Sequence, residues 1–170
     1  LYMRWFQMGI FTPVLRTHGQ HLPEPYQPEY NEYRDIISDY LALRYKMLPY
    51  IYSLSWLNTT QNTPITAPVN FYTDEEKDIA ELDDEYLFGP NMLIAPIMEP
   101  DAIRRKVVLP SGEWMEMTSL KTYEGNQTID FADIELNMPV YLRRGTFTPY
   151  YAQTEYSNIE NINRGRLQVV

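Results

Sequence analysis

The sequence predicts two unlike parts, an α/β start followed by an all-β antiparallel sandwich domain. Apolar residues between positions 36 and 57 recur at steps of three and four, which indicates a long amphipathic helix. After Pro64 the pattern changes to short apolar runs separated by turns that contain glycine, proline or asparagine. Short strands joined by short turns are typical of antiparallel sandwiches and barrels. We therefore expect the boundary between the parts near residues 62–64.

The first residues predict a helix, a strand and a loop. Aromatic and apolar side chains in residues 2–8 recur near helical spacing, and Gly9 is a plausible helix stop. Residues 10–15 form a brief apolar run of strand length that contains Pro13. The polar, proline-rich stretch that follows, residues 17–28, is predicted to be a loop.

The long helix is predicted to begin near Asn31, whose side chain can cap the first free amide groups. Pro49 lies inside the pattern, and its ring removes the hydrogen bond to the carbonyl of Tyr45. Because the apolar stripe continues across Pro49, we predict one bent helix rather than two helices.

The second part is predicted to contain strands at residues 65–72, 86–88, 92–98, 104–109, 113–118, 127–131 and 139–143. Residues 166–170 also alternate like a strand. Clustered carboxylates at 74–76 and 83–85 lack the alternating spacing of calcium ligands, so we interpret residues 74–85 as a solvated acidic loop. No metal and no cofactor are expected.

The composition favours a folded protein without a nucleic-acid partner. Of the 170 residues, 44% are apolar, and the net charge is −9. Nucleic-acid binding needs a basic surface, which this charge argues against. No apolar run approaches the roughly 20 residues that span a bilayer, so no membrane partner is expected. Leu1 is not an initiator methionine, and the chain reads like the inside of a longer one.

Several motifs resemble glycoside hydrolase family 31. Residues 1–19, which include Arg4-Trp5, Arg16 and His18-Gly19, are similar to the segment that closes the family's catalytic barrel. Residues 43–53, with their internal proline, resemble its last barrel helix. Residues 88–97, 109–114 and 138–145 resemble strands of its proximal β-sandwich, and the resemblance thins after about Tyr151.

The resemblance implies a retaining α-glycosidase on a (β/α)₈ TIM barrel. Such a barrel needs about 250 residues, so only its last strand and helix fit here. The implied organisation is the end of the barrel at 1–63, the β-sandwich at 64–151, and a linker with the start of a distal β-domain at 152–170. The family's catalytic aspartates lie on earlier strands, and their motifs do not occur in this chain. The chain alone is therefore expected to be inactive.

The resemblance assigns one site residue, His18, which would hydrogen-bond a hydroxyl of the sugar at the cleavage point. Arg16 is expected to pair with a barrel carboxylate rather than with substrate, and His21 is expected to be structural. The implied partners are an α-linked oligosaccharide and the rest of the barrel. A periplasmic or extracellular location is expected rather than a cytoplasmic one.

Three functional interpretations stay open. The first is an α-glucosidase that acts on oligosaccharides. The second is an α-glucosyltransferase or α-xylosidase of the same family, because the residues that choose among these activities lie mostly elsewhere. The third is a non-catalytic carbohydrate-binding or scaffolding β-sandwich, in which the helical segment is a linker.

Overall fold

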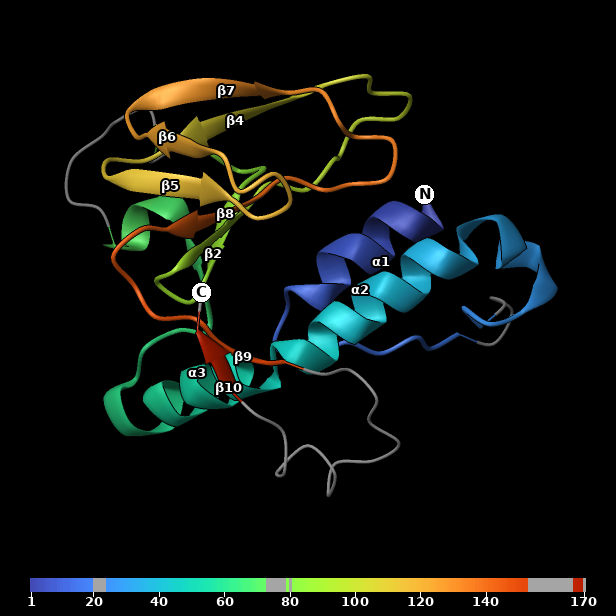
Figure 1. Cartoon of the computed structure of the whole chain (residues 1–170), viewed down its shortest axis with the longest axis horizontal. Coiled ribbons are helices and arrows are strands. Elements are labelled where there is room, and N and C mark those ends of the chain that lie inside the picture. Colours follow the sequence, from blue (N-terminus) through green and yellow to red (C-terminus); the bar gives the residue numbers. More distant parts are fainter. Residues whose placement is uncertain (20–23, 73–78, 80, 153–166, 170) are drawn as a thin grey trace. The chain divides into compact units, whose positions relative to one another are not determined.

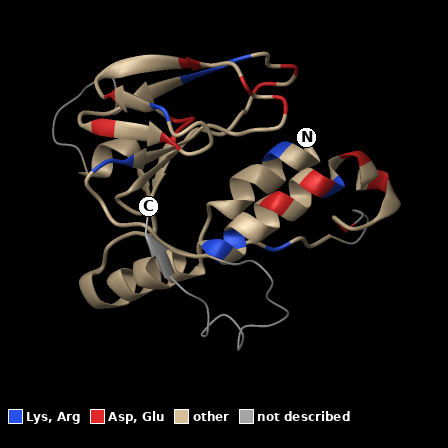
Figure 2. Ribbon diagram, in the orientation of Figure 1, with Lys and Arg blue, Asp and Glu red and all other residues tan. Residues whose placement is uncertain are grey.

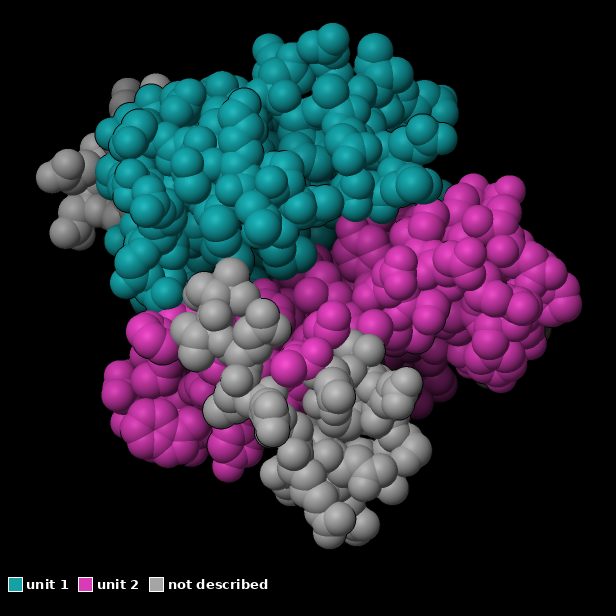
Figure 3. Space-filling view, in the orientation of Figure 1, with its two compact units in different colours: residues 1, 64–146 teal, residues 2–63, 147–170 magenta. Residues whose placement is uncertain are grey.

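The computed structural model describes residues 1–19, 24–72, 79, 81–152 and 167–169 (Figure 1). The chain divides into two compact units, which Figure 3 colours separately. The helical unit contains residues 2–63 and 147–170, and the β unit contains residue 1 and residues 64–146. Acidic residues occur on helices and strands alike, in keeping with the net charge of −9 (Figure 2). In the part of the chain that the structure describes, no helix could cross a membrane.

The helical unit consists of α1 (Tyr2–Ile10), the 3₁₀ helix η1 (Pro28–Tyr33), α2 (Arg34–Lys46), α3 (Leu48–Gln61), β9 (Pro149–Tyr151) and β10 (Leu167–Val169). Helix α1 packs against α2, and β9 packs against α3 (Figure 1). Strands β9 and β10 pair antiparallel. The segment after α1 lies beside α2, since Arg44 of α2 donates to the carbonyls of Thr12 and Pro13.

Gly9 does not end the first helix, so the predicted stop is wrong. Helix α1 continues to Ile10, which is fully buried. A Cβ atom on Gly9 would lie 2.7 Å from the Cδ1 atom of Leu15. The absence of a side chain at position 9 therefore serves the close approach of Leu15 rather than helix termination.

The predicted strand at residues 10–15 is also not formed. Residues 11–13 turn, and residues 14–19 have no regular secondary structure. A strand needs a neighbour that supplies its hydrogen bonds. None of the described residues pairs with this segment, although its apolar character is that of a strand.

The long helix is two helices, which corrects the prediction of one bent helix. Helix α2 ends at Lys46, Met47 lies between, and α3 begins at Leu48 with Pro49 in its first turn. Proline suits the first turn of a helix, where its missing N–H would have had no partner. The helical hydrogen bonds begin again there, since the amide of Ile51 donates to the carbonyl of Met47 at 2.9 Å.

The predicted cap at Asn31 is wrong as well. Asn31 lies inside η1, and Tyr33 precedes α2 without a capping side-chain bond. The Oδ1 atom of Asn31 instead accepts from Nη2 of Arg34 at 2.5 Å. The 3₁₀ helix, which leads directly into α2, thus replaces the expected side-chain cap.

The β unit contains two antiparallel sheets. The larger sheet has the strand order β1-β2-β3-β8-β5-β6. In the smaller sheet, β4 pairs with β7 (Figure 1). The bounds are β1 Thr66–Pro68, β2 Tyr86–Phe88, β3 Met92–Ile94, β4 Arg105–Leu109, β5 Glu113–Glu116, β6 Thr122–Glu124, β7 Gln127–Phe131 and β8 Val140–Arg143.

One hydrophobic cluster joins the two sheets. The larger sheet contributes Leu87, Leu93, Trp114 and Tyr141, and the smaller contributes Val107, Leu109 and Phe131. Burial of these side chains between the sheets supplies the main driving force for folding of this unit. The predicted antiparallel sandwich is confirmed.

The strand predictions differ from the structure mainly in length. β2 and β7 have the predicted bounds, whereas residues 69–72 form the 3₁₀ helix η2 (Val69–Tyr72) in place of a longer β1. β3 ends at Ile94, before Pro96, which has no amide hydrogen to give to a ladder. β6 was not predicted, because its three residues are exposed or half-buried and show no apolar alternation.

Candidate functional site

His18 lies in the irregular segment after α1, and its side chain is exposed. The guanidinium Nη2 of Arg16 lies 3.2 Å from its Nδ1 atom. Because arginine can only donate, Nδ1 must accept, and a neutral imidazole then carries its proton on Nε2. In that tautomer the Nε2–H of His18 is free to donate to a hydroxyl group of a ligand.

Arg16 has a different neighbour from the one expected. Its guanidinium contacts His18, whereas we expected it to pair with a carboxylate of the barrel. The earlier barrel strands are not part of this chain, so that pairing stays a prediction. The two contacts are compatible, since a guanidinium has five N–H groups and the imidazole takes one.

Side chains of this segment project to two sides. Leu15 packs over Gly9 of α1, and the hydroxyl of Thr17 donates to Oε2 of Glu24 at 2.7 Å. Both line a cavity beside α1 and α2, whereas Arg16 and His18 do not. Successive side chains of residues 15–18 therefore alternate in direction. Leu15 and Thr17 pack toward the helices, and Arg16 and His18 project from the other side.

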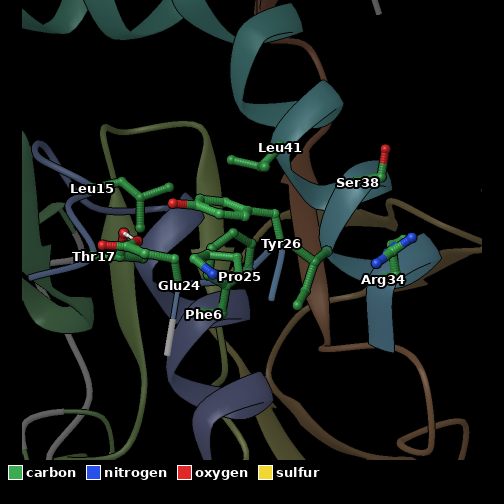
Figure 4. Close-up of a pocket in the computed structure, with 10 residues that line it drawn as sticks. Phe6, Leu15, Thr17, Glu24, Pro25, Tyr26, Arg34, Ser38 and Leu41 are labelled. Atoms are coloured by element: carbon green, nitrogen blue, oxygen red, sulfur yellow. Dashed lines mark hydrogen bonds between the residues drawn. The ribbon is translucent and has the colours of Figure 1, made fainter. Parts of the chain in front are cut away.

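The cavity has a volume of about 670 Å³, and Figure 4 shows it. Its walls are Phe6, Leu15, Thr17, Glu24, Pro25, Tyr26, Arg34, Ile37, Ser38 and Leu41. The dashed line in Figure 4 joins Thr17 to Glu24, and Arg34 and Ser38 lie toward the other end of the view. The wall is mostly apolar, and the Glu24 carboxylate already accepts a hydrogen bond from Thr17. The cavity lies on the packing side of the segment, so we do not assign substrate to it.

The acidic segment 83–85 is only partly solvated, which corrects the prediction for Glu85. Asp83 is exposed, but Glu85 is 5% exposed. Its Oε1 atom accepts from the amide of Val108 at 2.9 Å and lies 3.7 Å from Nη2 of Arg105. Burial raises the pKa of Glu85 to about 7. This carboxyl belongs to the sandwich interior.

Metal binding finds no support in the described residues. Among residues 1–19, 24–72, 79, 81–152 and 167–169, no three His, Asp or Glu side chains gather closely enough to hold an ion. His21, the loop residues 20–23 and the carboxylates at 74–76 lie outside the described residues, as do 153–166 of the expected linker.

Comparison with known families decides the assignment. Residues 62–147 match the model described as "Glycosyl hydrolase family 31 C-terminal domain". Residues 1–54 match the model described as "Glycosyl hydrolases family 31 TIM-barrel domain". The chain belongs to glycoside hydrolase family 31. The expected family is thus confirmed, and His18 falls within the barrel match.

Two relatives in this family are each 36% identical to the chain. One is an α-xylosidase of Saccharolobus solfataricus, aligned over 88% of this chain and 20% of its own length. The other is α-glucosidase 2 of Bacillus thermoamyloliquefaciens, aligned over 86% and 19%. The chain spans about a fifth of the length of these relatives.

Solved family 31 structures have the same fold. An α-xylosidase from Xanthomonas citri superposes with a TM-score of 0.87 at 34% identity, over 98% of this chain and 18% of its own. A dextranase from Flavobacterium johnsoniae, solved with glucose, gives 0.85 at 29% identity, over 94% and 20%. The helical segment belongs to this shared fold, which argues against its interpretation as a linker to a stand-alone sandwich.

Proposed function

We propose that this chain is the carboxy-terminal part of a retaining family 31 glycosidase that cleaves α-glucosidic bonds in oligosaccharides. The observation that carries the proposal is the match of residues 1–54, which include His18, to the family's TIM-barrel domain. The relative named α-glucosidase 2 supports the choice of α-glucosidic bonds. The rest of the barrel is the implied partner, and a periplasmic or extracellular location is part of the proposal.

In the proposed mechanism, His18 binds substrate and performs no bond cleavage. Its Nε2–H donates to a hydroxyl of the sugar at the cleavage point, while Arg16 fixes the tautomer. Retaining hydrolysis needs two carboxyl groups about 5 to 5.5 Å apart, one as nucleophile and one as acid and base. We place both on earlier barrel strands, outside this chain. The proposed organisation is barrel end at 1–63, sandwich at 64–151, and linker with distal domain from 152.

The substitution His18→Ala in the longer enzyme tests this role. Loss of one hydrogen bond to the sugar should lower kcat/KM on an α-glucoside by about 10- to 100-fold. Because the side chain is exposed, Tm should stay unchanged. The control Lys121→Ala changes another exposed residue, in the β unit, and should leave kcat/KM unaltered. An unchanged kcat/KM for H18A removes His18 from the substrate site.

An α-xylosidase is the second candidate, favoured by two similar relatives with that name. The two activities differ in whether the pocket accepts the exocyclic hydroxymethyl group of glucose. Steady-state kinetics on the nitrophenyl α-glucoside and α-xyloside separate them. A higher kcat/KM on the glucoside supports the first proposal, and a tenfold preference for the xyloside replaces it with the second.

A further inference from the structure

Arg44 of α2 makes a three-point contact with the chain after α1. Its Nη1 atom donates to the carbonyl of Ile10 at 2.6 Å and to that of Thr12 at 2.5 Å. Its Nη2 atom donates to the carbonyl of Pro13 at 3.0 Å. One side chain thus binds the end of α1 and both residues that follow the buried Phe11.

Arginine suits this contact for two physical reasons. The last carbonyl groups of a helix lack partners within it and carry partial negative charge, so a cation at the end of α1 is favoured. The planar guanidinium also presents several N–H groups in a fixed fork, which lets one residue reach carbonyls in different directions. A lysine ammonium, as a point charge on a flexible stem, cannot hold all three in the same geometry.

A second contact, between Leu15 and α1, lies along the chain between the carbonyls that Arg44 binds and His18. Two residues after Pro13, Leu15 lies against α1 where Gly9 has no side chain, with the Cδ1 atom 2.7 Å from a Cβ position there. The next side chain, Arg16, contacts His18. Arg44 and Leu15 therefore fix the start of the segment from which Arg16 and His18 project.

We propose that Arg44 is a positioning residue, which sets the place of His18 by holding the carbonyls of Ile10, Thr12 and Pro13. The inference rests on the proposed role of His18 in sugar binding. Arg44 itself touches no substrate in this account. Small misplacements of a binding group can cost up to about 100-fold in rate, so a residue that acts only on position can have a kinetic effect.

A double-mutant cycle in the longer enzyme tests the inference by kinetics. Arg44→Gln should lower kcat/KM about 10-fold in the wild-type background and less than about 2-fold in the H18A background, since only a present His18 can be misplaced. Arg44→Lys should fall between wild type and R44Q. The control Ile51→Val removes a methylene from the buried side of α3 and should lower Tm without changing kcat/KM.

A second measurement does not depend on activity. In the longer enzyme with ¹⁵N-labelled histidine, the imidazole nitrogens of His18 can be assigned by NMR as the signals that H18A lacks. Wild type should show one tautomer with the proton on Nε2, and R44Q should move toward the spectrum of Arg16→Gln, in which the contact to Nδ1 is lost.

The two measurements separate failure of this inference from failure of the proposed function. An equal loss of kcat/KM in both backgrounds, or an imidazole spectrum unchanged by R44Q, overturns the positioning role. If H18A has full activity, the proposed function of His18 fails, and the spectrum alone then decides whether Arg44 sets the position of the imidazole.

Discussion

Glu85 shows how one buried side chain can make stability depend on pH. Its Oε1 atom contacts Val108 and Arg105 of β4, while its Oε2 atom is buried without a hydrogen bond. Burial raises its pKa from 4.5 to about 7, against the opposing effects of the Val108 amide and Arg105, and nearby Asp84 raises it further. The carboxyl is therefore neutral in the folded state at pH values where it is ionised in the unfolded chain.

The free energy of unfolding depends on pH because the pKa of Glu85 is higher in the folded state than in the unfolded chain. Between about 4.5 and about 7 the folded state binds more protons, so the free energy of unfolding falls as the pH rises through this window. Across the whole window, the free energy of unfolding should fall by about 3 kcal/mol. Glu85→Gln should flatten this dependence, as measured by urea denaturation from pH 4.5 to 8.

A matched control is the exposed carboxylate of Glu113, which pairs with Arg144 at 3.0 Å on the surface. Exposed pairs contribute about 0–1 kcal/mol, so Glu113→Gln should keep the wild-type slope. If E85Q retains that slope too, Glu85 is not the group that titrates, and its buried position would have to be reconsidered.

Among single residues, the sequence singles out His18, whose role stays a prediction, but not Arg44 or Glu85. His18 stands in a motif, and a motif can be recognised without coordinates. Arg44 was part of another motif, yet its three carbonyl partners lie more than 30 positions earlier, and no local pattern links them. Glu85 ends an acidic run that looks solvated, and only the fold shows that β4 covers it.

At the scale of elements, two turns of the sandwich pack against each other. The amide of Gly125, after β6, donates to the carbonyl of Gly112, before β5, at 2.6 Å. A Cβ atom on Gly125 would lie 1.9 Å from the carbonyl oxygen of Pro110. Backbone atoms cannot move aside as the end of a side chain can, so this position is closed to any side chain.

Gly125→Ala should therefore destabilise the β unit by several kcal/mol, as other severe steric replacements do. Gly145→Ala is the control, because its φ of +77° is costly for alanine but nothing lies within 4 Å of its Cβ position. We expect a loss of about 1–2 kcal/mol there. Thermal denaturation of both variants checks the difference, and equal losses would contradict the steric explanation.

Elements were predictable where one local signal decides them. β2 and β7 were found because strand patterns end at clear turns. The break at Met47 was not found, since a continuous apolar stripe does not show where the hydrogen-bond ladder stops. The strand at residues 10–15 was predicted from its side chains. A strand also needs a hydrogen-bonded partner strand, and the residues that the structure describes provide none for this segment.

At the scale of the whole chain, the two units contribute differently to the proposed enzyme. The helical unit carries the proposed substrate contact at His18, together with the side chains that hold it. The β unit has its own core between two sheets and matches the family's C-terminal domain. The chain spans about a fifth of the length of the two relatives that are 36% identical to it. We propose that the carboxyl groups that cleave the bond lie in the remaining part of the enzyme.

Turnover of a chromogenic α-glucoside should be compared between the isolated 170-residue chain and the longer enzyme. We predict robust hydrolysis with retained anomeric configuration by the longer enzyme and none by the chain, because we propose that the nucleophile and its acid/base partner both lie outside these residues. Robust turnover by purified chain alone would contradict the account, since both carboxyl groups would then have to lie within these residues.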